Sequence, residues 1–206
     1  MSKETCRLMS KKYIPQQMIL KSRFKDLYQN WSEEDRNLLI DKMNILINEN
    51  SKFTDSNNYG FMCNLLSSLA IIQVLEDKKM PRKEAQQYVA DAMYKFIEPQ
   101  IKSMKKLASH SFFVRMLKIT MPLKFKKTLG YGWDVEFPKC EKNEFTMITH
   151  KCIFQQIFEK YGMPEMTAVF CKVDDILYSD LPCADFLYTQ QIGTGGKMCD
   201  YTFRKK

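Results

Sequence analysis

The sequence predicts an α+β protein in which an N-terminal helical bundle packs on a four-stranded antiparallel sheet of ββααββ order. Residues 1–128 carry apolar side chains at three- and four-residue spacings, the period of an amphipathic helix. From residue 129 onward, apolar and polar side chains begin to alternate, which is typical of half-buried strands. The chain has 206 residues, 45% of them hydrophobic, which is enough to bury a core. We therefore expect a helical half over 1–128 and a ββααββ half over 129–206 that carries the site, joined in one compact domain.

The first helices are marked by a cap and by an apolar run. Ser32 can cap a helix over 33–48, because the three acidic residues that follow it would lie at the positive end of that helix. Residues 61–77 are apolar on almost every side. We expect this second helix in the middle of the bundle, with Cys63 as a buried structural thiol.

Prolines delimit the next two helices. Pro81 begins a helix over 82–97, because proline is tolerated in the first turn, and Pro99 should kink or end it. Residues 100–120 are again helical in pattern, and Pro122 is expected to close that helix.

The spacing of apolar residues changes three times along the C-terminal half. An antiparallel hairpin comes first, two helices follow, and two strands joined by a glycine turn end the chain. The expected elements are strands within 129–140 and 144–152, helices over 152–161 and 165–180, a strand over 184–192, a turn over 193–196 and a last strand over 197–204.

Charge and composition limit the kinds of partner. The net charge is +8, but the lysines are scattered, which argues against a nucleic-acid surface. No segment approaches about 18 consecutive apolar residues, and the N-terminus lacks the pattern of a secretion signal, so we expect no membrane partner and a cytoplasmic location. Seven cysteines, an odd number, indicate free thiols rather than a disulfide framework. The expected partner is a small-molecule substrate, and a homo-oligomer is left open.

Cys171 is followed by two carboxylates at helical spacing. Asp174 lies three residues on and Asp175 four, so a helix places both near the thiol. A thiol beside carboxylates can act as a nucleophile once a base or cation lowers its pKa, and the same groups can hold a divalent metal. A core cysteine with both aspartates in water explains the spacing about as well. The metal is therefore unassigned, and the sequence requires no cofactor.

A histidine and a cysteine stand two residues apart where a strand should end. His150 and Cys152 would point the same way in an extended chain. They could form half of a zinc site completed by Cys171 and Cys199, or His150 could serve as a general base. A plain sheet-edge histidine explains the pattern better than either, because two close Cys-x-x-Cys pairs are missing.

The glycine cluster lies between the last two expected strands. Gly193-Thr194-Gly195-Gly196 lacks the Lys-Ser/Thr ending of a phosphate loop, and its simplest interpretation is a tight turn that needs positive φ. Its amides could also approach a ligand carboxylate. Cys199 and Asp200 on the next strand point to opposite faces, and the apolar pattern leaves open which of them faces the core.

Taken in order, these motifs resemble the L-2-amino-thiazoline-4-carboxylic acid hydrolase family over roughly residues 129–203. The resemblance rests on this ordered set: Cys152; Gly162, Pro164 and Glu165; Phe170, Cys171 and Asp174; Thr189; Gly195, Gly196, Cys199, Asp200, Tyr201 and Phe203. The order of elements is also similar to four-vinyl-reductase-type small-molecule-binding domains, which supports the fold alone.

The family resemblance implies hydrolysis of a small cyclic amidine. Water adds to the carbon between ring sulfur and nitrogen, and the ring opens to an S- or N-carbamoyl cysteine. By this resemblance Asp174 would hold the amidine as a cation, and Cys171 would attack directly or position a water or metal. Cys199 would complete the pocket from the last strand, which makes these three the expected catalytic residues.

The resemblance also implies a set of substrate-binding residues. Thr189 and the amides of Gly195 and Gly196 would bind the substrate carboxylate, and Asp175 would support the cation site. His150 joins this expected set. The alternative function is a small-molecule-binding or sensor domain without catalysis, in which the same strands line an apolar pocket and the thiols are buried and inert.

Overall fold

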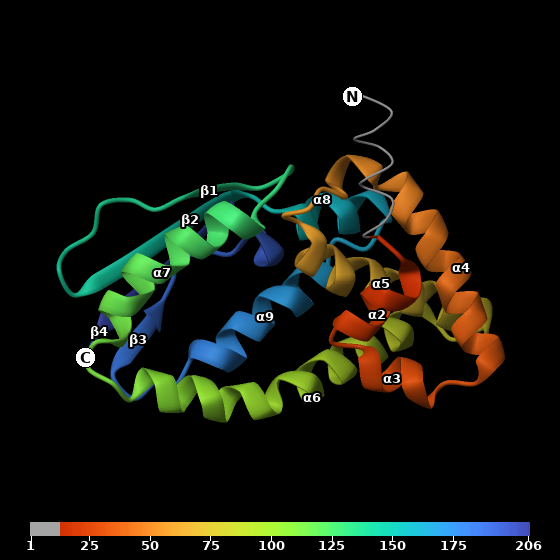
Figure 1. The fold of residues 1–206 in the computed structure, drawn as a ribbon, viewed down its shortest axis with the longest axis horizontal. Helices are drawn as coiled ribbons and strands as arrows, with labels where there is room; N and C mark the ends of the chain where they lie inside the picture. The colour runs from red at the N-terminus through yellow and green to blue at the C-terminus, as the bar shows by residue number, and fades with distance from the viewer. Residues whose placement is uncertain (1–12) are drawn as a thin grey trace. The chain divides into compact units, whose positions relative to one another are not determined.

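The computed structural model describes residues 13–206 and divides the chain into two compact units (Figure 1). The first unit runs to Phe96 and the second covers Ile97–Lys206. The change of composition expected at residue 129 falls inside the second unit. We describe each unit by itself.

The first unit is helical throughout its described part. Its elements are α2 (Pro15–Lys21), α3 (Lys25–Asn30), α4 (Glu33–Glu49), the short 3-10 helix η1 (Ser51–Phe53), α5 (Tyr59–Asp77) and the beginning of α6 (Arg82–Ala108). Ser32 caps α4 as predicted, since its hydroxyl accepts the amide of Asp35 at 3.1 Å. Both α2 and α4 pack against α5.

The central position of α5 confirms the prediction from its apolar sequence. Most of its side chains are buried, and Cys63 is 1% exposed. By length and composition α5 also passes the test for a membrane-crossing helix, with 72% of its apolar window buried. A buried core helix passes the same test, so the result is weak evidence for a membrane.

Two proline predictions are wrong in their boundaries. α6 runs through Pro99 to Ala108, and α7 (Phe113–Thr128) runs through Pro122. The chain breaks between these helices instead, at residues 109–112, where turn hydrogen bonds replace the helical pattern. A proline removes only one helical hydrogen bond, and the face of α7 formed by Phe113, Val114 and Leu117 is buried, which offsets that loss.

The second unit contains the sheet. After α7 come β1 (Asp134–Glu136), β2 (Glu144–Lys151), α8 (Ile153–Lys160), α9 (Met166–Tyr178), β3 (Ala184–Leu187), the 3-10 helix η2 (Ile192–Thr194) and β4 (Cys199–Lys205). The four strands are antiparallel and lie in the order β1-β2-β4-β3. The α+β class and the four-stranded sheet are confirmed. The ββααββ order is not matched exactly, because η2 stands between the last two strands.

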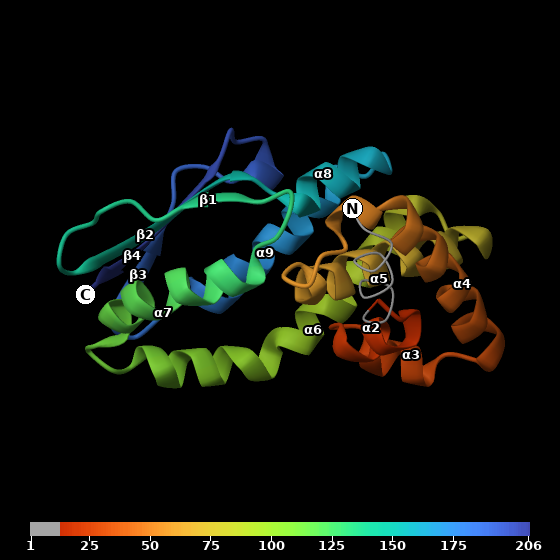
Figure 2. The same ribbon diagram turned by 45° about the horizontal axis from the view of Figure 1, so that its top comes forward.

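Strand alternation decides which side chains face the core of this unit. Along β4, Cys199, Tyr201 and Phe203 are buried and the residues between them are partly exposed. This settles the choice that the sequence left open, since Cys199 faces inward and Asp200 outward. α7 lies against β2 and β4 (Figure 2), and Phe203 meets Phe113 there with ring centroids 6.3 Å apart.

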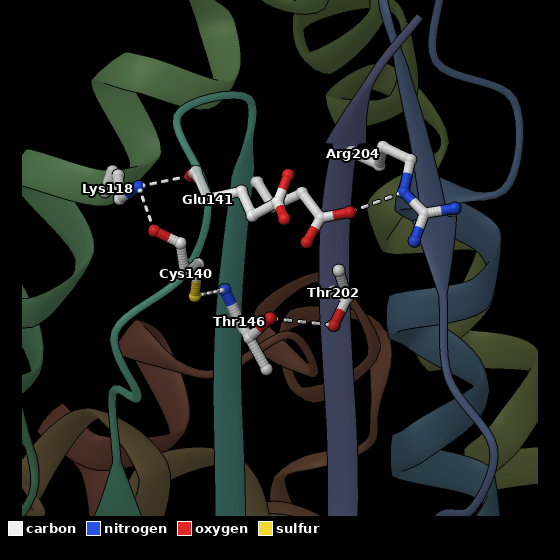
Figure 3. Close-up of polar contacts among 7 residues, drawn as sticks. Lys118, Cys140, Glu141, Thr146, Thr202 and Arg204 are labelled. Carbon is white, nitrogen blue, oxygen red and sulfur yellow. Dashed lines mark hydrogen bonds and ion pairs between the residues drawn. The ribbon is translucent and has the colours of Figure 1, made fainter.

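A group of polar contacts fixes the turn between β1 and β2 (Figure 3). Nζ of Lys118 on α7 donates to the carbonyls of Cys140 at 3.1 Å and Glu141 at 2.6 Å. The Cys140 sulfur in turn accepts the amide of Thr146 at 3.2 Å. This thiol therefore supports the hairpin, far along β2 from the strand end that leads into α8.

Candidate functional site

Two cysteine sulfurs meet on the inner face of the sheet. Cys199 begins β4, is 6% exposed and shares its strand face with Tyr201. Cys171 lies on α9, and its thiol is hydrogen-bonded to the Cys199 sulfur. Consecutive residues of η2 contact both sulfurs: the Ile192 nitrogen lies 3.3 Å from Sγ of Cys199, and the Gly193 amide donates to Cys171. Helix α9, strand β4 and η2 thus converge on one pair of thiols.

The hydrogen bonds divide this pair into a donor and an acceptor. The hydrogen bond from Cys171 has the largest effect on the pKa of Cys199. Together with hydrogen bonds from the Ile192 amide and the Tyr201 hydroxyl, it lowers that pKa to about 7, although burial acts to raise it. The same bond, followed by burial, raises the pKa of Cys171. Burial raises the pKa of Tyr201, which therefore keeps its proton and donates it. Cys199 is the sulfur better placed to be a thiolate.

Gly193 and Gly195 are required in the glycine turn for different structural reasons. A Cβ on Gly193 would lie 2.8 Å from Sγ of Cys171 and 2.8 Å from the Ala168 nitrogen, closer than real Cβ atoms approach. Gly193 is thus required by the close packing of η2 on α9. Gly195 has a φ of +91°, so the positive φ predicted for the turn falls on this residue. The Gly196 amide closes the turn on the Gln191 carbonyl at 2.8 Å.

A third thiol, that of Cys152, lies close to this pair. Cys152 is the N-cap residue of α8, and its side chain makes no capping hydrogen bond. Burial is the largest effect on this thiol and raises the pKa of Cys152 to about 11. Its charge, if formed, would act on both Cys199 and Cys171. Of the three thiols, Cys199 alone has a lowered pKa.

The two aspartates of α9 lie near the thiols but have different surroundings. Asp174 is close enough to Cys152 and Tyr201 for its charge to raise the pKa of both groups. Asp175 accepts a hydrogen bond from the Tyr188 hydroxyl. It also accepts one from Nε2 of the Gln191 side chain, at 3.3 Å. The structure therefore brings Asp174, Cys171 and Cys199 into one neighbourhood; the helical spacing had predicted only that the two aspartates lie near Cys171.

Thr189 has a partner that the sequence did not predict. Its amide donates to Oδ1 of Asp200 at 2.9 Å, its hydroxyl donates to Oδ2, and the Gln190 amide donates to Oδ1 at 3.0 Å. Because Asp200 takes these amides, the chain leaves the sheet after Leu187, and β3 is shorter than the strand expected over 184–192. The Thr189 hydroxyl therefore has Asp200 as its hydrogen-bond acceptor.

A cavity of about 460 Å³ opens beside Cys152 and Ile192, and its lining does not include Cys171, Cys199 or Asp174. Its walls come from the end of β2, the first turns of α8 and the η2 turn. The lining includes His150, Lys151, Cys152, Glu159, Ile192, Gly195, Gly196 and Lys197. Three of the predicted substrate-binding residues, His150, Gly195 and Gly196, thus share one cavity, and its side chains include two lysines.

His150 does not contact the sulfur pair. The pairing of β2 with β1 shifts register at this point, so that His150 has no partner residue on β1. Its Nε2 lies 3.4 Å from Oε1 of Glu136. No cluster of three or more His, Cys, Asp or Glu side chains within residues 13–206 could hold a metal ion. The zinc alternative built on His150 and Cys152 therefore has no set of ligands in this part of the chain.

Several residues of the site escaped sequence reasoning. Tyr201 belonged to the quoted motif without a role, and its spacing of two from Cys199 on a strand was the signal that it shares the thiol's face. Lys151 and Lys197 gave no signal, because surface lysines are common and only the fold brings β2 and the η2 turn together.

These features define an α+β protein with a pair of hydrogen-bonded thiols, and with a cavity that Cys152 and Ile192 help to line. A model of the L-2-amino-thiazoline-4-carboxylic acid hydrolase family matches residues 63–203, more than half of the chain. The chain belongs to this family. The match extends beyond the resemblance read from residues 129–203 and includes most of the helical half.

The other comparisons add little. The chain is similar to an Fe(II) unliganded H-NOX protein mutant from K. algicida at 12% identity, with 92% of this chain and 95% of that chain covered and a TM-score of 0.32. It is also similar to an H-NOX domain from Shewanella oneidensis in the Fe(II)CO ligation state at 10% identity, with coverages of 84% and 97% and a TM-score of 0.28. Scores this low carry no argument. No curated protein matches.

Proposed function

We propose that this protein hydrolyses a small cyclic amidine, in a ring opening similar to that of L-2-amino-thiazoline-4-carboxylate. The observation that carries the proposal is the hydrogen-bonded pair of Cys171 and Cys199, with a cavity that Cys152 and Ile192 help to line. Membership of the family gives the reaction class. The catalytic residues are Cys199, Cys171 and Asp174.

The thiols have distinct roles in this proposal. Cys199, held as a thiolate by Cys171, the Ile192 amide and Tyr201, attacks the amidine carbon or activates the water that attacks it. Cys171 donates to that sulfur, and its raised pKa keeps it protonated for this purpose. This reverses the sequence expectation, which gave the attack to Cys171, because Cys199 receives more donors than Cys171 does.

Substrate binding requires charges of both signs, since the family substrate joins an amidine to a carboxylate. Asp174 lies near the thiols and would hold the amidine as a cation, supported by Asp175. Lys151 and Lys197 line the cavity and would attract the carboxylate, with the Gly195 and Gly196 backbone beside them. His150 and Thr189 act less directly in this scheme, because His150 lies beside Glu136 and the Thr189 hydroxyl donates to Asp200.

The direct test is turnover of L-2-amino-thiazoline-4-carboxylate, followed by NMR of the ring-opened product. We expect Cys199→Ser and Cys171→Ser to lose turnover while circular dichroism shows an intact fold. Cys183→Ser is the matched control, because the Cys183 thiol donates to the Ser109 carbonyl at 3.2 Å, away from the site. Full turnover in both site variants would remove the thiols from the mechanism.

The same experiment separates catalysis from binding alone. If the protein binds the compound, as measured by calorimetry, and releases it unchanged, the non-catalytic binding function predicted as the alternative replaces the hydrolase. If it neither binds nor opens this ring, related cyclic amidines of similar size remain the substrate class to assay, and their failure would end the proposal.

A further inference from the structure

The thiol pair has a second chemical capacity that hydrolysis does not require. Two sulfurs in hydrogen-bond contact can be joined by oxidation, provided that one is a thiolate and both are held in place. The contacts of η2 meet the second condition. The Ile192 nitrogen contacts the Cys199 sulfur and Gly193 packs closely against the Cys171 sulfur, so the same turn contacts both thiols.

We propose that Cys171 and Cys199 form a reversible disulfide when the protein meets a peroxide, which makes this pair a redox-sensitive modification site. The proposal rests on the proposed function only for its consequence, the loss of hydrolysis on oxidation. The formation of the bond depends on the two sulfurs alone.

The chemistry takes two balanced steps. The Cys199 thiolate attacks one oxygen of hydrogen peroxide, so that an S–O bond forms, the O–O bond breaks and hydroxide leaves, to be protonated to water. The sulfur is oxidised to a sulfenic acid by two electrons, and the peroxide is reduced. The Cys171 sulfur then attacks the Cys199 sulfur; the S–S bond forms, the S–O bond breaks, and the hydroxyl leaves as water with the proton of Cys171.

Cys152 is a third thiol that could compete with Cys171 for the bond to Cys199. Cys152 is close enough for its charge to act on Cys171 and Cys199, but Cys171 is the thiol that is hydrogen-bonded to the Cys199 sulfur. Among the interactions that change the pKa of Cys152 or of Cys199, none is a hydrogen bond between these two thiols. We therefore expect Cys171, rather than Cys152, to be the partner of Cys199.

The test uses the full chain, fully reduced and then treated with hydrogen peroxide at neutral pH. The remaining thiols are blocked with iodoacetamide, and the protein is digested without reductant and analysed by mass spectrometry. We expect a peptide pair linked through Cys171 and Cys199, a mass loss of two hydrogens in the intact chain, and reversal of both by dithiothreitol.

Two variants distinguish the possible results. Cys171→Ser should lose the link and leave Cys199 as a sulfenic acid that dimedone traps, whereas Cys152→Ser, the matched control from the same cluster, should form the link as the wild type does. Loss of the link in Cys152→Ser, a bond from Cys199 to any other cysteine, or oxidation of Cys199 to sulfinic acid without a link would overturn the proposal. Because these readouts need no substrate, they stand even if the chain opens no ring.

Discussion

The carboxylate of Asp200 accepts both the amide and the hydroxyl of Thr189, with 2.9 Å between the amide nitrogen and Oδ1. Asp200 is the immediate neighbour of Cys199 on β4 and points to the other face of the sheet. Its bonds to Thr189 and Gln190 hold the start of the segment that leads into η2, and η2 contacts both sulfurs. One carboxylate on the outer face therefore helps to position the thiols on the inner face.

We expect Asp200→Asn to destabilise the fold by about 1–3 kcal/mol, because charge-assisted hydrogen bonds from Thr189 and Gln190 are weakened together. Urea unfolding followed by circular dichroism measures the loss. Asp185→Asn is the control: Asp185 forms a 3.6 Å ion pair with Lys206 at the surface, and such pairs contribute little. Equal stability of Asp200→Asn and the wild type would contradict the positioning role.

The same variant should also change the acid limb of the stability profile. Burial would raise the pKa of Asp200, but the hydrogen bonds from Thr189 and Gln190 outweigh it and hold the pKa below its ordinary value. The folded chain therefore releases this proton more readily than the unfolded chain. Its contribution is complete above about pH 4 and disappears as the pH falls through the lowered pKa. Asp200→Asn should flatten that part of the profile.

Tyr201→Phe tests the electrostatics of the thiol pair. The Tyr201 hydroxyl is one of the donors that lower the pKa of Cys199 to about 7, so its removal should raise that pKa. We expect labelling of Cys199 by iodoacetamide at neutral pH to slow about twofold, the effect of a rise of roughly half a pKa unit on the thiolate fraction. Peptide mass spectrometry assigns the label to Cys199. Tyr188→Phe serves as the control, because that hydroxyl donates to Asp175 and does not contact Cys199. A labelling rate that rises in Tyr201→Phe would refute this account of the thiolate.

Gly193→Ala tests the packing of η2 on α9. The new Cβ would lie 2.8 Å from both the Cys171 sulfur and the Ala168 nitrogen, and a backbone neighbour cannot rotate away. We expect a loss of about 1–3 kcal/mol in the free energy of unfolding. Gly60→Ala, which has nothing within 4 Å of its added Cβ, should be neutral or stabilising. Comparable stability of the two variants would mean that η2 can move away from the thiols without cost.

The elements of this fold were predictable where a single segment decides them. Ser32 and the acidic residues after it specify the beginning of α4 by local capping chemistry, and the apolar run of α5 predicts a core helix. The boundaries at Pro99 and Pro122 were not predictable, because tertiary packing offsets the loss of one hydrogen bond in each helix.

The site shows the same division between local and tertiary information. Cys171 and Asp174 share a helix, so their proximity follows from spacing alone. The commitment of Thr189 to Asp200 joins residues from two strand ends, and no local pattern signals it. The choice of Cys199 as the acceptor depends on donors from η2 and β4 that only the fold assembles.

The lysines of the cavity provide the last prediction. Lys151 and Lys197 line the cavity beside Cys152 and Gly196, so each should attract a substrate carboxylate without touching the reacting carbon. We expect Lys197→Met and Lys151→Met each to raise the KM for L-2-amino-thiazoline-4-carboxylate about fivefold, the effect of about 1 kcal/mol, with little change in kcat. The neutral carboxamide of the same compound should show no such increase. Added salt should raise the KM of the wild type toward that of the variants, because salt screens exposed charges.

Lys142→Met is the matched control, since Lys142 is exposed in the turn before β2, at the opposite end of that strand from Lys151. Equal effects on the acid and the carboxamide would show that the lysines act on the fold rather than on the substrate's charge.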